Sequence, residues 1–67
     1  MDITKKLGKK VKSIRLAKGL SQGKLAVILS VKTPYISQIE RGLNNLSLKS
    51  IEKIAKALKV SVIDLLK

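Results

Sequence analysis

Apolar residues recur along this chain at the three- and four-residue spacings that place them on one face of a helix. No stretch alternates in the manner of a half-buried strand, and no hairpin signal separates the apolar runs. The pattern predicts five helices, at about residues 1–18, 22–29, 33–41, 48–58 and 61–67. We therefore expect an all-α fold, with a single domain over residues 1–67.

Capping residues and a glycine mark where several of these helices begin and end. Ser21, Ser47 and Ser61 each precede an apolar run, and each can accept a hydrogen bond from the unpaired N–H groups of a first helical turn. Asp64 follows Ser61 at the spacing of a capping box. Gly42 is placed like the glycine that follows a helix C-terminus, since it adopts a left-handed conformation without steric cost.

The first helix is defined more sharply at its end than at its start. Asp2 and Thr4 are both candidate N-caps, whereas Gly19 ends the helix. Its apolar face is formed by Leu7, Val11 and Ile14, and the stem of Lys18 can extend it. The fourth helix has a longer apolar face, formed by Leu48, Ile51, Ile54, Ala55 and Leu58.

The central stretch from Ser21 to Gly42, SQGKLAVILSVKTPYISQIERG, predicts two short helices joined by a tight turn. The apolar face of the first is formed by Leu25, Ala26 and Leu29, and that of the second by Ile36 and Ile39. Pro34 suits the first turn of the second helix, because that position needs no backbone N–H. The rest of the chain is organised around this pair.

This pair resembles the helix-turn-helix of the lambda repressor-like family, which includes Cro and xenobiotic-response-element type regulators. The similarity extends from about Leu7 to the C-terminus. The matching residues are Leu20, Ser21, Gln22, Leu25, Ala26, Val31, Tyr35, Ile36, Ser37, Ile39, Glu40, Arg41 and Gly42. The resemblance implies a compact five-helix DNA-binding domain, whose second and third helices form the helix-turn-helix.

Several positions depart from the pattern of that family. Lys24 stands where a glutamate usually completes a capping box, and Ser30 and Lys59 stand where glycine is frequent. A residue other than glycine with φ > 0 is uncommon, so the turn at Ser30 is expected to be unusual. Val27 and Ile28 are apolar where relatives are commonly polar. They are either partly exposed side chains or a contact surface for another protein.

The net charge of +11, from 15 lysines and arginines against 4 acidic residues, favours a polyanionic partner, with nucleic acid first. There are two alternatives to nucleic-acid binding. The lysines only maintain solubility, or they bind an anionic membrane surface. With no cysteine or histidine there is no disulfide framework, no usual zinc site and no obvious set for acid–base catalysis. We expect a binding protein rather than an enzyme, without metal, cofactor or small-molecule ligand.

The sequence contains no signal for a membrane or for secretion. No apolar run approaches the roughly 18 residues that span a bilayer. The first ten residues, MDITKKLGKK, lack the apolar stretch of a secretory signal. We therefore expect a cytoplasmic protein.

The second helix of a helix-turn-helix presents its N-terminal residues to base edges in the major groove, where each base pair has its own donor and acceptor pattern. The resulting candidates for base contact are Lys32, Thr33, Pro34, Ser37 and Gln38. Gln38 is the strongest, because its amide can pair with N6 and N7 of adenine. Thr33 can contact a thymine methyl group, and Pro34 offers only van der Waals contact. The alternative for each is a solvated polar face.

The resemblance also implies contacts to the DNA backbone around this helix. Gln22 is the expected phosphate clamp, since helix N-termini favour anions. The candidates for backbone contact are Gln22, Lys24, Tyr35, Arg41, Asn44, Asn45 and Arg15. The resemblance further implies a structural ion pair of Arg15 with Glu40. We hypothesise that this pair orients the second helix, so that loss of Arg15 weakens DNA binding more than loss of Lys12.

One such domain contacts a short half-site, and dimers bind two half-sites about 34–36 Å apart. The candidates for a homodimer interface are Val60, Ile63 and Leu66, which alternatively complete the core around Leu58, Val62 and Leu65. We predict a sequence-specific DNA-binding transcriptional regulator, most simply a repressor, that binds a palindromic operator. A phage Cro-like repressor, a restriction–modification controller and an antitoxin-like regulator all remain open. A protein–protein adaptor, using Leu16, Val27 and Ile28, is the rival.

Overall fold

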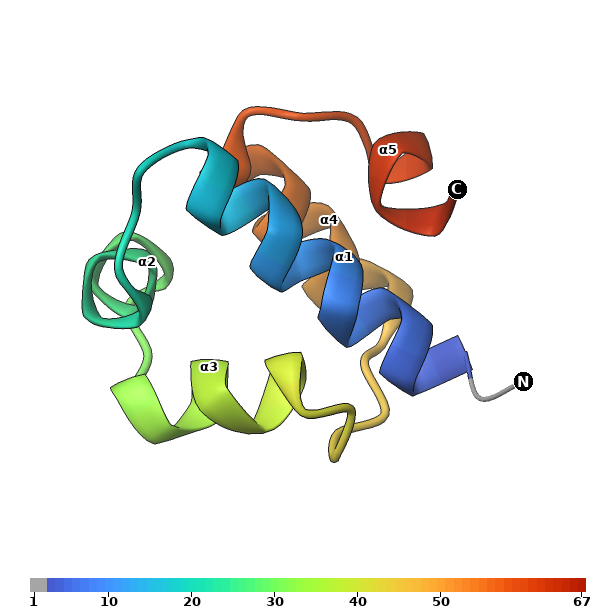
Figure 1. The fold of residues 1–67 in the computed structure, drawn as a ribbon. Helices are drawn as coiled ribbons and strands as arrows, with labels where there is room; N and C mark the ends of the chain where they lie inside the picture. The colour runs from blue at the N-terminus through green and yellow to red at the C-terminus, as the bar shows by residue number, and fades with distance from the viewer. Residues whose placement is uncertain (1–2) are drawn as a thin grey trace.

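The computed structural model describes residues 3–67 and is all-helical over that range, as predicted. The helices are α1 (Ile3–Ala17), α2 (Gln22–Leu29), α3 (Thr33–Glu40), α4 (Leu48–Leu58) and α5 (Val62–Leu66). α3 packs against α1 and α2, whereas α5 packs against α1 and α4 (Figure 1). Within residues 3–67, no helix combines the length and the apolar character needed to cross a membrane.

The helix boundaries agree with the sequence pattern to within a residue, apart from the predicted start of α1, which falls outside the described residues. α1 ends at Ala17 rather than Lys18, and α3 ends at Glu40 rather than Arg41. The predicted cap at Asp2 lies outside the described residues. The alternative cap at Thr4 is wrong, because Thr4 lies inside α1 and its hydroxyl donates to the carbonyl oxygen of Gly42 at 3.2 Å.

The three serine caps are confirmed. Ser21, Ser47 and Ser61 have extended backbone conformations, and each accepts a hydrogen bond from the backbone N–H three residues later. At α5 the capping box is complete, since the N–H of Ser61 also donates to the carboxylate of Asp64 at 3.0 Å. These local bonds explain why the helix starts could be predicted from sequence.

Two residues other than glycine adopt the left-handed conformation at helix ends. Ser30, after α2, has φ 58°, and Lys59, after α4, has φ 60°. Each stands where the resemblance leads us to expect glycine, and the backbone adopts the left-handed conformation although the side chain is not glycine. This conformation costs an L-residue roughly 1–2 kcal/mol, which the surrounding packing must offset. Gly42, with φ 75°, ends α3 without that cost.

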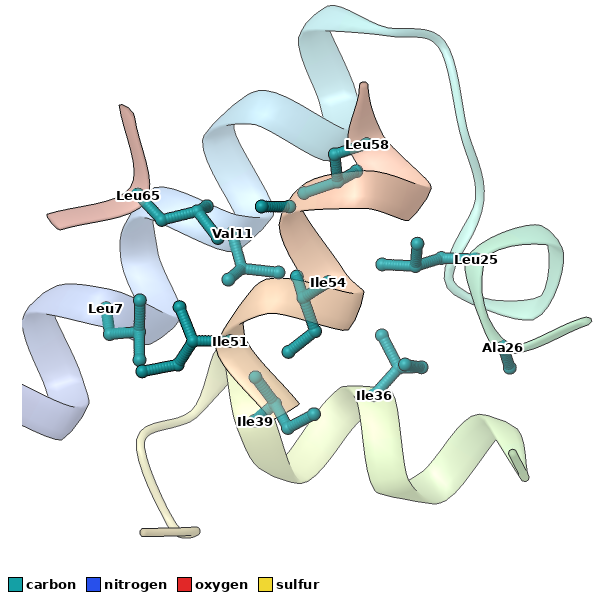
Figure 2. Close-up of a cluster of buried hydrophobic side chains, with 11 residues drawn as sticks. Leu7, Val11, Leu25, Ala26, Ile36, Ile39, Ile51, Ile54, Leu58 and Leu65 are labelled. Atoms are coloured by element: carbon teal, nitrogen blue, oxygen red, sulfur yellow. The ribbon is translucent and has the colours of Figure 1, made fainter. Parts of the chain in front are cut away.

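The five helices enclose one hydrophobic core (Figure 2). The buried residues are Leu7, Val11, Leu25, Ala26, Ile36, Ile39, Ile51, Ile54, Ala55, Leu58 and Leu65. The predicted inward residues Ile14 and Leu29 are half-buried against this core. The prediction that Leu48 belongs to the inward face of α4 is wrong, because 65% of its surface is exposed. It is the first residue of α4, so the helix face that it begins reaches the core only at Ile51.

Gly8 brings the backbone of α1 directly against the end of α3. A Cβ atom at Gly8 would lie 2.8 Å from the carbonyl oxygen of Glu40 and closer still to that of Ile39. A few residues earlier in α1, the Thr4 hydroxyl donates to the Gly42 carbonyl. The C-terminal end of α3 is therefore held by α1 through backbone contact, which positions the exposed face of α3.

Candidate nucleic-acid interface

The exposed face of α3 holds all five candidates for base contact. Lys32, Thr33, Pro34 and Gln38 are exposed and Ser37 is half-buried. The opposite face of α3 is committed to the interior, where Ile36, Ile39 and Glu40 are buried. Pro34 lies in the first turn, as predicted, and Lys32 is the N-cap residue without a side-chain capping bond. The side chains available to a groove are thus those that the sequence singled out, and their contacts with bases stay predictions.

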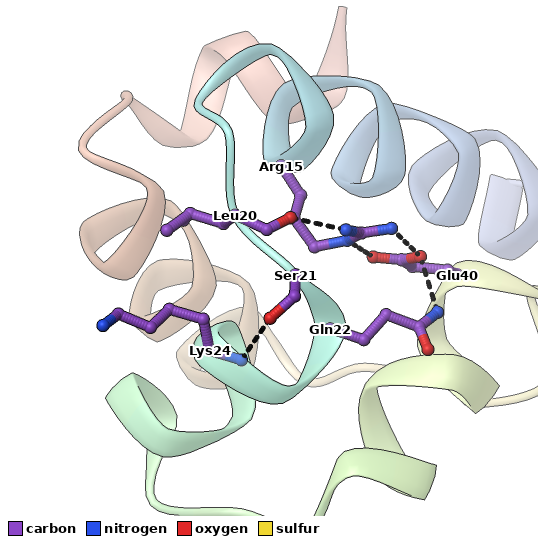
Figure 3. Close-up of polar contacts among 6 residues, drawn as sticks. All are labelled: Arg15, Leu20, Ser21, Gln22, Lys24 and Glu40. Carbon is purple, nitrogen blue, oxygen red and sulfur yellow. Dashed lines mark hydrogen bonds and ion pairs between the residues drawn. The ribbon is translucent and has the colours of Figure 1, made fainter.

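A buried ion pair joins α1 to the end of α3 (Figure 3). Arg15 Nε donates to Glu40 Oε2 at 2.6 Å, and Arg15 Nη2 donates to Glu40 Oε1 at 3.2 Å. The two side chains are only 7% and 3% exposed. Such a two-pronged arginine–carboxylate contact fixes geometry as well as charge. It holds the last residue of α3 against α1.

Two further contacts complete this network. Arg15 Nη1 donates to the carbonyl oxygen of Leu20 at 2.6 Å, and Gln22 Nε2 donates to Glu40 Oε1 at 3.0 Å (Figure 3). The network therefore ties together α1, the loop before α2, the first residue of α2 and the end of α3. In this arrangement Arg15 contacts both Leu20 and Glu40, and its predicted roles in orienting α3 and in contacting phosphate stay predictions.

The bond between Gln22 and Glu40 was missed by sequence reasoning, which assigned Gln22 only to phosphate. The two residues are 18 positions apart and lie on different helices, so no helical spacing links them. Gln22 is half-buried. Its side-chain NH₂ group faces Glu40 in the structure, and its phosphate contact stays a prediction.

The remaining backbone-contact candidates surround α3. Lys24, at the start of α2, is exposed, as are Arg41 and Asn45 after α3, whereas Tyr35 and Asn44 are half-buried. The only carboxylate in α2, α3 and the turn between them is the buried Glu40. The exposed surface of the helix-turn-helix is therefore free of negative charge, as a phosphate-facing surface requires.

The dimer candidates divide into two kinds. Ile63 is 67% exposed and Leu66 is 47% exposed, so α5 presents apolar surface to solvent. Val60 is half-buried against the core, which is closer to the alternative that it completes the core.

Hydrogen bonds from Ser61 hold the pKa of Asp64 below its ordinary value of 3.8 and keep the carboxylate charged at the start of α5.

The chain belongs to the helix-turn-helix family. The family model described as Helix-turn-helix matches residues 11–65. The lambda repressor-like family predicted from the sequence is thereby confirmed.

Similar proteins are named as controllers. The chain is 55% identical over 60 residues to control protein C.BamHI of Bacillus amyloliquefaciens, covering 88% of this chain and 74% of that one. It is 41% identical over 66 residues to control protein C.SmaI of Serratia marcescens, covering 98% and 79%. The structure superposes on the restriction-modification controller protein C.AhdI from Aeromonas hydrophila with a TM-score of 0.87 and 39% identity, covering 92% and 94%. Other regulators that it matches are longer: the chain spans 42% of one from Rickettsia conorii.

Proposed function

We propose that this chain is a sequence-specific DNA-binding transcriptional regulator that inserts α3 into the major groove. The observation that carries the proposal is the division of α3 into two faces. One face is buried and locked by the Arg15–Glu40 pair, and the other presents only uncharged or positive side chains. A rigidly held helix with such a face matches the groove in shape and in charge.

In this proposal Gln38 is the main base-contacting residue. Its exposed amide can donate to N7 and accept from N6 of adenine in a bidentate pair. Thr33 and Ser37 contact neighbouring bases through hydroxyl and methyl groups, and Lys32 can donate to guanine. Pro34 contributes van der Waals contact. These side chains specify the operator.

Contacts to phosphates set the register of α3 without specifying sequence. The proposed set is Gln22, Lys24, Tyr35, Arg41, Asn44 and Asn45, which flank α3 at the start of α2 and after the end of α3. The positive charge of the chain adds an attraction that falls steeply as salt rises.

A homodimer is proposed to bind a palindromic operator, with half-sites about one helical turn apart. The exposed apolar residues of α5, Ile63 and Leu66, together with Val60, supply the interface. The similarity to control proteins favours a restriction–modification controller in the cytoplasm over the phage or antitoxin settings. Repression is the simplest action, because a dimer in the groove occludes its own stretch of DNA.

Selection of binding sites from randomised duplex DNA tests this proposal. We expect a palindrome with half-sites about one turn apart. Gln38→Ala should relax preference at one position per half-site, by about 1–3 kcal/mol, whereas Asn45→Ala should weaken binding to all sequences alike. If no motif is recovered and affinity only falls with salt, the positive charge binds the phosphate backbone without sequence specificity, and the proposal fails.

The adaptor remains the second candidate, because α1 and α2 expose apolar side chains. Val27 is 75% exposed, Leu16 is 57% exposed and Ile28 is 47% exposed. DNA binding that survives polar substitution of Val27 and Ile28 would separate this surface from the operator interface.

A further inference from the structure

An apolar hollow lies where the α2–α3 turn and the start of α3 meet α4. Its apolar lining comes from Leu29, Val31, Tyr35 and Ile54. Ile54 is buried and the other three are half-buried, so they form a surface fixed by the core. The hollow holds about 500 Å³, within the range of small-molecule sites in proteins.

The charged side chains that line this hollow are all positive. They are Lys32 and Lys53, Ser50 adds an uncharged hydroxyl, and no lining residue carries a carboxylate. Within residues 3–67 the ion pairs join Arg15 to Glu40 and Lys67 to Asp64, so neither of these lysines has a carboxylate partner there. Two unpaired ammonium groups beside an apolar surface complement an anion that carries an apolar body.

The apolar surface continues along α2 and α4. A second hollow of about 380 Å³ shares Leu29 and Lys53 with the first and is completed by Ile28, Lys56 and Ala57. It adds apolar area and a further ammonium group, again without a carboxylate. The combined groove suits an extended or flat body rather than a compact one.

We propose that this groove binds a small anionic amphiphile, a carboxylate or sulfonate on an aromatic or extended apolar body. The anionic group pairs with Lys32 and Lys53, and the body lies on Leu29, Val31 and Ile54. The sequence alone predicted no small-molecule ligand, because the lining residues come from two distant segments, 29–35 and 50–54.

Such a ligand would compete with the operator. Lys32 and Tyr35 line the hollow and are also in the proposed DNA interface. Engaging Lys32 in an ion pair removes it from phosphate or base. This regulatory consequence rests on the proposed function, whereas binding of the anion does not.

The test uses 2-naphthoate as the probe and neutral 2-naphthamide as its control, each titrated into the ¹⁵N-labelled full chain at low salt. For a probe of about thirteen heavy atoms, ordinary ligand efficiency gives a Kd on the order of 1 mM. We expect naphthoate to shift the backbone amides of residues 29–35 and 50–57, and naphthamide to bind more weakly. Equal binding of both probes, shifts scattered over the lysines of α1, or no saturable shift would overturn the proposal.

Variants on α4 locate the site. Lys53→Gln should weaken naphthoate binding about two- to fivefold, the range for one exposed ion pair, and leave naphthamide unchanged. Lys49→Gln makes the same charge change on the same helix outside the lining and should have no effect. Ser50→Leu fills the hollow without altering charge and should abolish binding of both probes. Unaltered naphthoate binding by a folded Ser50→Leu chain would place the probe elsewhere. None of these measurements contains DNA, so their outcome is independent of the proposed operator.

Discussion

At position 40 the chain places a carboxylate at the end of the helix proposed to enter DNA. If exposed, it would repel phosphate. The structure instead buries it against the Arg15 guanidinium and the Gln22 amide. An isolated buried charge is far more costly than a buried pair, so each partner depends on the other. Glu40 therefore contributes only indirectly to the proposed interface, through its contacts at the end of α3.

Replacing Glu40 by glutamine should destabilise the fold. The change leaves the Arg15 side chain, 7% exposed, without its countercharge. Breaking a buried pair in this way costs about 3–5 kcal/mol, which urea unfolding would measure. Glu52→Gln is the matched control on an exposed position of α4, with an expected change within about 0.5 kcal/mol. Equal effects from the two substitutions would show that the pair contributes nothing beyond surface charge.

The double substitution Arg15→Met with Glu40→Leu separates stability from DNA binding. Apolar replacement of both partners of a buried pair is often neutral or stabilising, so the free energy of unfolding should recover most of the loss. If the pair positions α3, operator affinity should stay reduced, and by more than for Lys12→Ala on the exposed side of α1. Full recovery of both quantities would mean that the pair has no positioning role. Binding by filter or fluorescence anisotropy, beside urea unfolding, gives both readouts.

At the scale of elements, two glycines in helices should respond in opposite directions to alanine. A Cβ at Gly8 would meet the backbone carbonyls of α3, so Gly8→Ala must push α1 away from α3 and should cost about 1–3 kcal/mol. A Cβ at Gly23 would meet only Thr33 Oγ1 at 3.8 Å and Ser21 Oγ at 3.9 Å. Gly23→Ala should therefore stabilise by about 0.5–1 kcal/mol, the ordinary gain in a helix interior. Urea unfolding of the pair tests this contrast, and two changes of the same sign would contradict it.

The helices and the contacts between them differ in how far they could be predicted from the sequence. Helix starts at Ser21, Ser47 and Ser61 were predictable because each capping hydroxyl and the backbone N–H that donates to it lie within one turn. The prediction for Leu48 failed because its helical spacing is right, but as the first residue of α4 it lies beyond the side chains that cover the core. Gly8 and the bond between Gln22 and Glu40 depend on how distant helices meet, and no local pattern records that. The outward position of the candidate side chains on α3 was predictable, because helical spacing assigns Ile36 and Ile39 to the opposite, buried face.

The capping box of α5 should give stability a pH dependence. Hydrogen bonds from Ser61 lower the pKa of Asp64 below 3.8, so the charged carboxylate favours the folded state. Because the folded pKa is the lower one, this contribution is fully present above about pH 4 and is lost as the pH falls through the folded pKa. Asp64→Asn should thus lower Tm near pH 6, with the gap to the parent chain narrowing below pH 3.8. A gap independent of pH would assign the effect to shape rather than charge.

For the whole molecule, the helix-turn-helix and α5 differ in where carboxylates lie relative to exposed apolar side chains. The helix-turn-helix surface lacks exposed carboxylates, whereas α5 combines exposed Ile63 and Leu66 with the half-buried Asp64. A second copy of this basic chain would meet least repulsion where a carboxylate lies beside apolar residues. This difference in charge favours α5 over α3 as the proposed dimer contact, which would leave α3 free for the proposed DNA binding.

Polar substitution of two exposed apolar pairs should distinguish the dimer from the adaptor. Ile63→Ser with Leu66→Ser removes the apolar surface of α5, so the chain should bind a single half-site as before but lose the gain from a palindrome. Val27→Ser with Ile28→Ser makes the same chemical change on α2 and should leave palindrome binding intact. Both pairs are exposed, so neither double variant should shift Tm by more than a few degrees. Sedimentation with single and paired half-sites measures the stoichiometry. Loss of palindrome binding in the α2 variant alone would instead assign the protein-contact surface to Val27 and Ile28.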